Sequence, residues 1–168
     1  MYSFDWSAEL LRSSTSSDPA KIRLSLTNTA SERVQLGFGP TPPFSMPLPN
    51  STDRRVPVLF HPEMGGNGQI PTTQENGCWR VQSELISIYD LLIQRQLEPD
   101  ETISNTYVLL AQKGTETTKN ACFADGTYNY IDTALLGRSE KHEMELAVEL
   151  GFKDGEFRDI SAPSPEIA

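Results

Sequence analysis

Residues 22–38, IRLSLTNTASERVQLGF, alternate between apolar and polar side chains on either side of a polar turn. Apolar side chains stand at every second position from Ile22 to Leu26 and again from Val34 to Phe38. The residues between these runs are of the kinds that form hairpin turns. A period of two bounded by a polar turn is typical of half-buried antiparallel strands. We therefore expect two strands here, each burying one face.

The same alternation recurs over most of the chain. It is found in residues 4–10, 102–111, 127–133 and 144–150, the last with Met144, Leu146, Val148 and Leu150 on one face. Seven or more short strands separated by turns predict an all-β fold, an immunoglobulin-like antiparallel β-sandwich. We expect a single domain over residues 1–152. The polar, proline-containing residues 153–168 read as a flexible C-terminal tail.

Residues 39–77 interrupt this rhythm and predict a long irregular insertion. Eight of the twelve prolines lie here, together with the glycine-rich run HPEMGGNGQ. Because proline removes a donor from the strand ladder, we expect only an edge strand, at Val56–Phe60. Regular structure is expected to return at Cys78–Val81. The stretch Glu84–Leu97 fits a helical stripe, but its β-branched residues and closing turn favour an extended segment leading into a strand.

One part of the insertion combines a rigid backbone with apolar side chains. Proline restricts the unbound chain, so such a loop loses little freedom when it docks. Exposed aromatic and methionine side chains are typical interface anchors. The candidate partner-contact loop comprises Pro42, Pro43, Phe44, Met46 and Leu48. The alternative is that these side chains bury themselves at the open end of the sandwich.

Charge and hydropathy narrow the range of partners. The 168-residue chain has a net charge of −9 at pH 7, and no basic run offsets it. Phosphate backbones are bound through positive surfaces, so we expect no nucleic acid partner. No apolar run approaches the roughly 20 residues that span a bilayer, so we expect no membrane-spanning segment. The expected partner is another protein.

The two cysteines, Cys78 and Cys122, are the only indication of compartment in the sequence. Each stands beside an aromatic residue at the end of an expected strand, which favours a disulfide between them. Closing a loop of that length stabilises a fold by about 4 kcal/mol in the chain-entropy model. The alternative is two buried free thiols. A disulfide favours an extracellular or cell-surface location. The opening residues MYSFDWSAEL lack signal-peptide features, so the protein is either cytoplasmic or had a leader removed.

Residue patterns that carry catalysis or bind metals are not found in the sequence. His61 and His142 lie in no nucleophile motif and no metal-ligand spacing, and are expected to be solvated surface residues. Cys122 has no following histidine at the spacing that a blue-copper loop needs. The glycines from Gly65 to Gly68 lack the Lys-Ser/Thr of a phosphate-binding loop. We expect no catalytic residues, no metal and no cofactor.

Three segments together resemble the intracellular proteinase inhibitor (BsuPI-like) domain family. The family's early strands match Thr27, Asn28, Val34, Leu36 and Phe38, and its mid-chain tryptophan matches Trp79. Its turn before a strand matches Leu97–Glu101, with Asp100 where glycine is usual, and its G-x-Y element falls on Gly126–Tyr128. The resemblance covers roughly residues 20 to 135, with the Pro/Gly-rich stretch as an insertion. It implies an immunoglobulin-like fold and offers no reactive-loop residues.

Two functions follow as hypotheses. The first is a non-enzymatic binding or interaction module that acts through its loops, in a prokaryotic surface or exported protein. It is motivated by the absence of catalytic motifs and by the proline-rich insertion. The second is a proteinase inhibitor, which only the family resemblance suggests. Because one fold hosts many functions, the resemblance does not decide between them.

Overall fold

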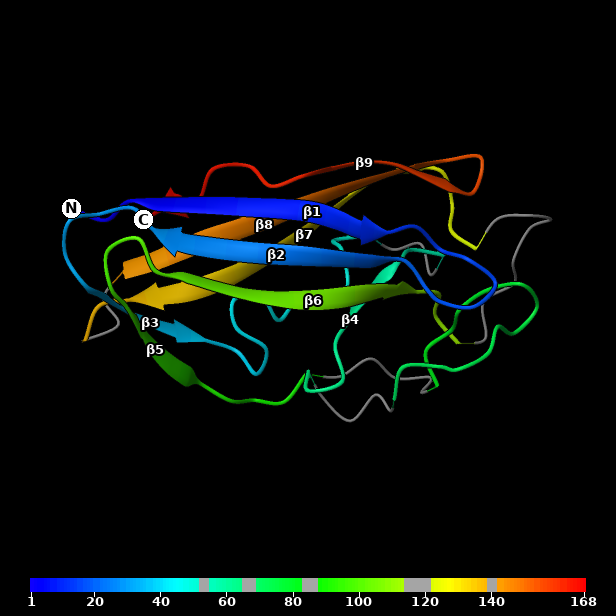
Figure 1. The fold of residues 1–168 in the computed structure, drawn as a ribbon, viewed down its shortest axis with the longest axis horizontal. Helices are drawn as coiled ribbons and strands as arrows, with labels where there is room; N and C mark the ends of the chain where they lie inside the picture. Colours follow the sequence, from blue (N-terminus) through cyan, green and yellow to red (C-terminus); the bar gives the residue numbers. More distant parts are fainter. Residues whose placement is uncertain (52–54, 65–68, 83–87, 114–121, 139–141) are drawn as a thin grey trace.

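The computed structural model describes residues 1–51, 55–64, 69–82, 88–113, 122–138 and 142–168, which form ten strands in two antiparallel sheets (Figure 1). The first sheet has the order β1-β2-β6-β4, formed by β1 (Phe4–Arg12), β2 (Lys21–Asn28), β6 (Thr102–Leu110) and β4 (Val58–Phe60). The second has the order β10-β8-β7-β3-β5, formed by β10 (Glu166–Ile167), β8 (His142–Lys153), β7 (Gly126–Leu136), β3 (Val34–Phe38) and β5 (Ile93–Leu97). A further strand, β9 (Glu156–Ser161), also pairs with β8. The predicted all-β sandwich is confirmed.

The alternating residues form the core between the two sheets. Inward-facing, buried side chains come from β2 (Ile22, Leu24, Leu26), β3 (Val34, Leu36, Phe38), β7 (Tyr128, Tyr130, Ala134, Leu136) and β8 (Met144, Leu146, Val148, Leu150). At the edge of the first sheet, the Trp6 indole N–H donates to the Ala147 carbonyl at 2.8 Å. That bond joins β1 to β8 of the opposite sheet. The period of two therefore places apolar side chains between two stacked sheets.

A second, smaller core lies on the outer face of the first sheet. Val58, Phe60, Val108 and Leu110 point away from the main core and pack against Trp79 and Val81. As a result, β6 is buried on both faces at its end, whereas alternation alone predicts that only one face is buried. The predicted edge strand within Val56–Phe60 is confirmed as β4. The regular structure expected at Cys78–Val81 is limited to two isolated β-bridges. One joins Glu75 to Cys78, and the other joins Arg80 to Ala111.

The C-terminal segment 153–168 differs from the expected flexible tail. Asp154 and Gly155 have φ values of 54° and 77°, which suit a tight two-residue hairpin turn. After this turn β9 pairs with β8, and β10 continues along the same edge of β8. Phe157 and Ile160 pack against the main core. The segment is therefore part of the second sheet, because its alternate side chains find apolar partners on β8.

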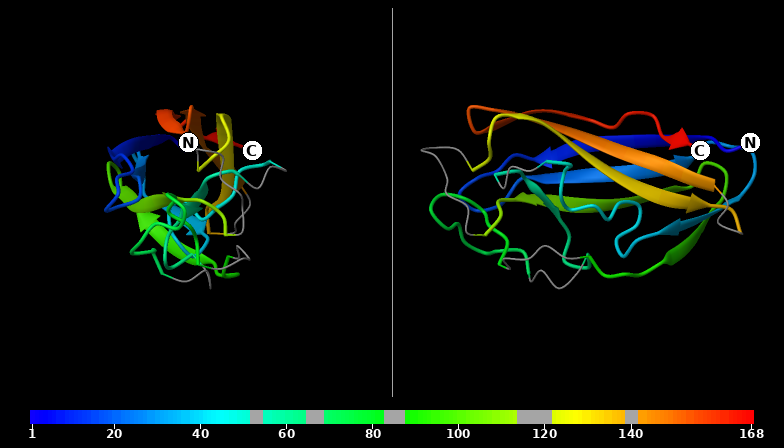
Figure 2. Two further views of the ribbon diagram at one scale, coloured as in Figure 1. Left: turned by 90° about the vertical axis from the view of Figure 1, so that its right-hand side faces the viewer. Right: turned by 180° about the vertical axis from the view of Figure 1, so that it is seen from behind.

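The two ends of the sandwich differ. Both chain termini lie at one end, where the Ala168 N–H donates to the Glu143 carbonyl at 2.9 Å. The loop between β1 and β2 and the turn between β8 and β9 lie at the other end, as the rear view in Figure 2 also shows. In the stretch before β5, residues 83–87 lie outside the described part, and Ile93–Leu97 forms the expected strand.

Candidate functional site

The expected partner-contact loop is packed inward and not displayed. Phe44 is completely buried and stacks on the Trp6 ring at a centroid distance of 5.9 Å. Pro43 is buried, while Pro42, Met46 and Leu48 are half-buried. Met46 and Leu48 pack against the main core. The structure therefore corrects the contact-loop hypothesis and agrees with the alternative, because the space beside Trp6 gives these apolar side chains more contact than solvent does.

Buried polar groups hold this loop against the sheets. The Ser45 N–H donates to Asp132 Oδ2 at 2.7 Å, and the Tyr107 hydroxyl donates to the carbonyls of Thr41 and Phe44. Burial raises the pKa of the Asp132 carboxyl, and two backbone N–H donors partly oppose that rise. Burial also raises the pKa of the Tyr107 hydroxyl. Both groups therefore tether the loop to the sheets.

The two histidines are not brought into a catalytic or metal-binding arrangement. His61 Nδ1 accepts a hydrogen bond from the Glu63 N–H at 3.0 Å, and its ring packs edge-on against Tyr107 at 5.9 Å. Burial lowers the pKa of His61, with the Glu63 charge opposing. His142 begins β8 and lies against Tyr2. Among the residues that the structure describes, no group of three or more His, Cys, Asp or Glu is placed to hold a metal.

The predicted disulfide is present. Cys78 and Cys122 are bonded, with their Cα atoms 5.6 Å apart. The bond joins the end of the insertion to the residues that enter β7. Gly65 to Gly68, considered above as a phosphate loop, lie outside the described residues.

A cavity of about 350 Å³ opens beside the disulfide, at the end of the sandwich away from the termini. Four parts of the chain form it: the loop between β1 and β2, the residues around the disulfide, the end of β6, and the hairpin of β8 and β9. Its lining consists of Ser13, Ser14, Ala20, Gly77, Trp79, Leu109, Cys122, Phe123, Phe152, Gly155, Glu156 and Phe157. We call this cavity the disulfide-end pocket. Its volume is within the range of small-ligand sites.

Aromatic rings form much of the wall of the disulfide-end pocket. Phe152 is central: its ring meets Phe123 at 5.0 Å and 62°, and Phe157 at 5.6 Å and 87°. Tyr128 supports Phe152 from one side at 6.0 Å. Trp79 adds a fourth ring to the lining and is itself 5% exposed. The wall is held by ring-to-ring packing from three separate segments.

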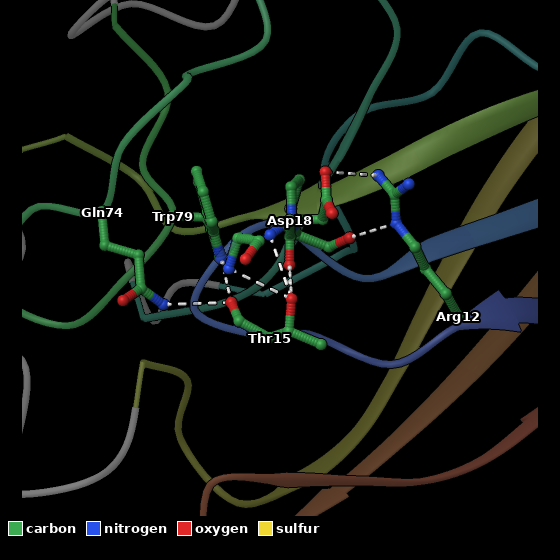
Figure 3. A network of polar contacts seen from close by, with 7 residues as sticks. Arg12, Thr15, Asp18, Gln74 and Trp79 are labelled. Carbon is green, nitrogen blue, oxygen red and sulfur yellow. Dashed lines mark hydrogen bonds and ion pairs between the residues drawn. The ribbon is translucent and has the colours of Figure 1, made fainter.

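Hydrogen bonds fix the wall that the β1–β2 loop provides (Figure 3). The Thr15 carbonyl accepts from the Trp79 indole N–H at 3.0 Å and from the Gln74 amide at 3.5 Å. Thr15 also accepts the Asp18 N–H through its hydroxyl, and the Arg12 guanidinium lies 3.8 Å from the Asp18 carboxylate. Trp79 therefore has its polar group satisfied, and its side chain packs in the second core while also contributing to the pocket lining.

The charges around the disulfide-end pocket are mainly negative. Of the described residues that line it, Glu156 is the one with an ionisable side chain outside the disulfide. Asp154 and Asp125 lie beside it, joined by a hydrogen bond from the Asp154 N–H to the Asp125 carboxylate at 2.8 Å. Lys153 stands opposite Glu156 in the β-hairpin register. The pocket mouth thus adds to the chain's overall negative charge.

A second surface feature is apolar. Ile88, Tyr89, Leu91 and Leu92 are 38%, 51%, 55% and 50% exposed, just before the edge strand β5. The Tyr89 N–H donates to the Met64 carbonyl at 2.9 Å, which fixes the segment locally. These four side chains form an exposed apolar segment beside the second sheet.

No family model matches the chain, and no curated protein or solved structure shows significant similarity to it. Among the described residues, no helix of the length and hydropathy needed to cross a bilayer is found.

The sequence predicted one component of the site and missed the others. The cysteines were paired, and their aromatic neighbours Trp79 and Phe123 were noticed. The alternating pattern alone gives Phe152 and Phe157 no functional role. They flank the Asp154-Gly155 turn, however, and so face each other across a hairpin. Such a turn between two aromatic residues is the signal that predicts their contact.

Proposed function

We propose that the protein is a non-enzymatic binding module that takes its partner at the disulfide-end pocket. The observation that carries this proposal is the pocket's construction. Four aromatic rings from three parts of the chain line a cavity of about 350 Å³, and one half of the disulfide, Cys122, lies in the same lining. Concave, mainly apolar cavities with a few polar groups are the usual form of ligand sites.

The strand order supports an immunoglobulin-like sandwich as the scaffold of this module. If β1, β2, β3, β4, β6, β7 and β8 are taken as strands A to G, the sheets have the orders A-B-E-D and C-F-G. These are the orders of constant-type immunoglobulin domains, in which loops cluster at the two ends. β5 then adds a strand beside C, and β9 and β10 cover the free edge of G. Membership of the BsuPI-like family stays a prediction from the sequence resemblance.

The disulfide also supports an exported or cell-surface location. Disulfides persist in oxidising compartments, and reducing agents of the cytosol keep most thiols free. The bond is weak support on its own, so the location is part of the proposal.

Fragment mapping by NMR tests the binding site. A library of small neutral and charged fragments is titrated into the ¹⁵N-labelled protein, and shifts are mapped onto assigned residues. We expect hits to gather on Trp79, Phe123, Phe152 and Phe157. Phe157→Leu should weaken them, whereas Phe4→Leu, an aromatic change on β1, should not. Hits concentrated on residues 88–92, or an absence of hits at the disulfide-end pocket, would refute the proposal.

The second candidate function, proteinase inhibition, is supported only by the family resemblance. Inhibitors present a rigid, exposed loop to the protease, and the family resemblance assigns no residues of this chain to such a loop. Titration against serine proteases at micromolar concentration tests this alternative. An absence of inhibition would remove it.

A further inference from the structure

We propose that the disulfide-end pocket selects an organic cation, an alkylammonium group, as its ligand. This inference rests on the proposed function and adds to it the chemical class of the ligand. It is carried by two independent features of the pocket, its aromatic wall and its charge.

The first feature is the arrangement of the rings. Phe123 and Phe157 both stand at steep angles to Phe152, 62° and 87°, so the rings lie in different planes around one cavity. Trp79 adds the ring type that attracts cations most strongly. Rings in several planes around a cavity are the arrangement by which proteins bind quaternary ammonium groups.

The second feature is the sign of the charge. Glu156 brings a carboxylate to the lining, and in the adjoining turn the Asp154 N–H donates to the Asp125 carboxylate at 2.8 Å. Of the nearby cations, Arg12 lies 3.8 Å from Asp18, whereas Lys153 is the cross-strand neighbour of Glu156 and opposes part of its charge. With a net charge of −9, the chain as a whole repels anions. An anion that carries hydrocarbon groups is therefore expected to bind poorly in this pocket, and a cation that carries them is expected to bind well.

Preorganisation strengthens the case. The Trp79 ring is held by its bond to the Thr15 carbonyl, and Cys122 fixes the neighbouring Phe123 through the disulfide. Phe152 and Phe157 are held in register by the tight turn between β8 and β9. A ligand that enters a preformed cage orders few side chains, so little of the binding free energy is lost.

The test compares a cation with a neutral molecule of the same shape. Choline chloride and 3,3-dimethylbutan-1-ol are titrated at constant ionic strength, and the Trp79 indole N–H resonance is followed by NMR. The Trp6 indole N–H, in the core, is the internal control. We expect choline to bind with a Kd on the order of 1 mM, as suits so small a ligand. The neutral alcohol should bind at least about tenfold more weakly.

Two variants separate the contributions of ring and charge. Glu156→Gln should weaken choline binding by about fivefold, whereas Glu143→Gln, at the far end of β8, should leave it unchanged. Phe157→Leu keeps an apolar side chain and removes the ring, so choline should bind about threefold more weakly and should lose more affinity than the alcohol does. Equal binding of choline and the alcohol, or full affinity in Glu156→Gln, would overturn the inference.

A third titration identifies the source of the cation. Nα-acetyl-lysine amide represents the side chain of a protein partner, and choline represents a free quaternary ammonium compound. Binding of either one above the neutral alcohol supports the cation inference, and their ratio says which source the pocket favours. If neutral fragments occupy the pocket and neither cation does, the cation inference fails and the binding-module proposal stands. If nothing occupies the pocket, both fail.

Discussion

Phe44 illustrates how a single side chain decides what a proline-rich segment does. Its neighbours are prolines, serine and threonine, which on composition belong at the surface. In the structure its ring lies on Trp6 and is completely buried, while the Ser45 N–H and the Tyr107 hydroxyl close the loop over it. The segment is thus a covering for the core. Contacts between residues so far apart in sequence leave no local pattern.

Truncating Phe44 should therefore destabilise the whole fold. Phe44→Ala leaves a cavity beside Trp6, and we expect the free energy of unfolding to fall by about 3–5 kcal/mol. Asn50→Ala, at an exposed position of the same segment, should change it by less than about 0.5 kcal/mol. Urea denaturation followed by tryptophan fluorescence measures both. Equal stability of the two variants would mean that the loop does not contribute to the core.

Alternation was sufficient to predict strands wherever one face meets the core and the other meets solvent. The alternate burial of side chains along β2, β7 and β8 follows directly from that period. It was insufficient at the end of β6, where the insertion covers the outer face through Trp79 and four consecutive residues are buried. Burial on both faces removes the period that marks a strand.

The C-terminal strand was missed for a different reason. Three of the six residues of β9 are charged, as suits a strand at the edge of the sheet, and within it only Phe157 and Ile160 reach the core. The local signal was the Asp154-Gly155 pair, which adopts positive φ readily and so reverses the chain at once. Edge strands often carry charged side chains, so in a sequence the preceding turn is the clearer sign of such a strand.

Removing β9 should cost stability and solubility. A chain ending at Lys153 loses the apolar contacts of Phe157 and Ile160 and leaves the edge of β8 unpaired. We expect the free energy of unfolding to fall by at least about 2 kcal/mol, and the protein to self-associate through the open edge. Urea denaturation and light scattering after size exclusion measure the two effects.

A chain ending at Ser161 is the matched control. It keeps β9 and loses residues 162–168, in which β10 is exposed and Ala162 is the one residue packed against the main core, so its stability should stay much closer to that of the full chain. If the chain ending at Lys153 were as stable and as monomeric as this control, residues 154–161 would be the flexible tail that composition suggests.

On the scale of the whole molecule, one covalent bond joins the long insertion to the second sheet. The bonded cysteines are separated by 44 positions in the sequence. Sequence reasoning predicted the bond but not the pocket beside it, because the pocket needs the β1–β2 loop and the β8–β9 hairpin to meet the same rim. That convergence is set by how the sheets stack, which no single segment encodes.

Reduction of the disulfide should lower the free energy of unfolding by about 4 kcal/mol, because the unfolded chain regains the freedom of the closed loop. Urea denaturation with and without dithiothreitol measures the difference. The variant Cys78→Ser/Cys122→Ser should show the lower stability in both buffers. A wild-type midpoint that does not respond to verified reduction would contradict the chain-entropy account of the bond.

The two chain termini lie at one end of the sandwich, and the aromatic cavity lies at the other. We call the end with the termini the base and the end with the cavity the tip. Whatever is joined to either terminus, whether a bead, a lipid or another polypeptide, stands at the base and leaves the tip facing outward. Copies attached side by side on one support would then all present their cavities in the same direction. Weak individual contacts to a surface rich in cationic groups would add up across such an array.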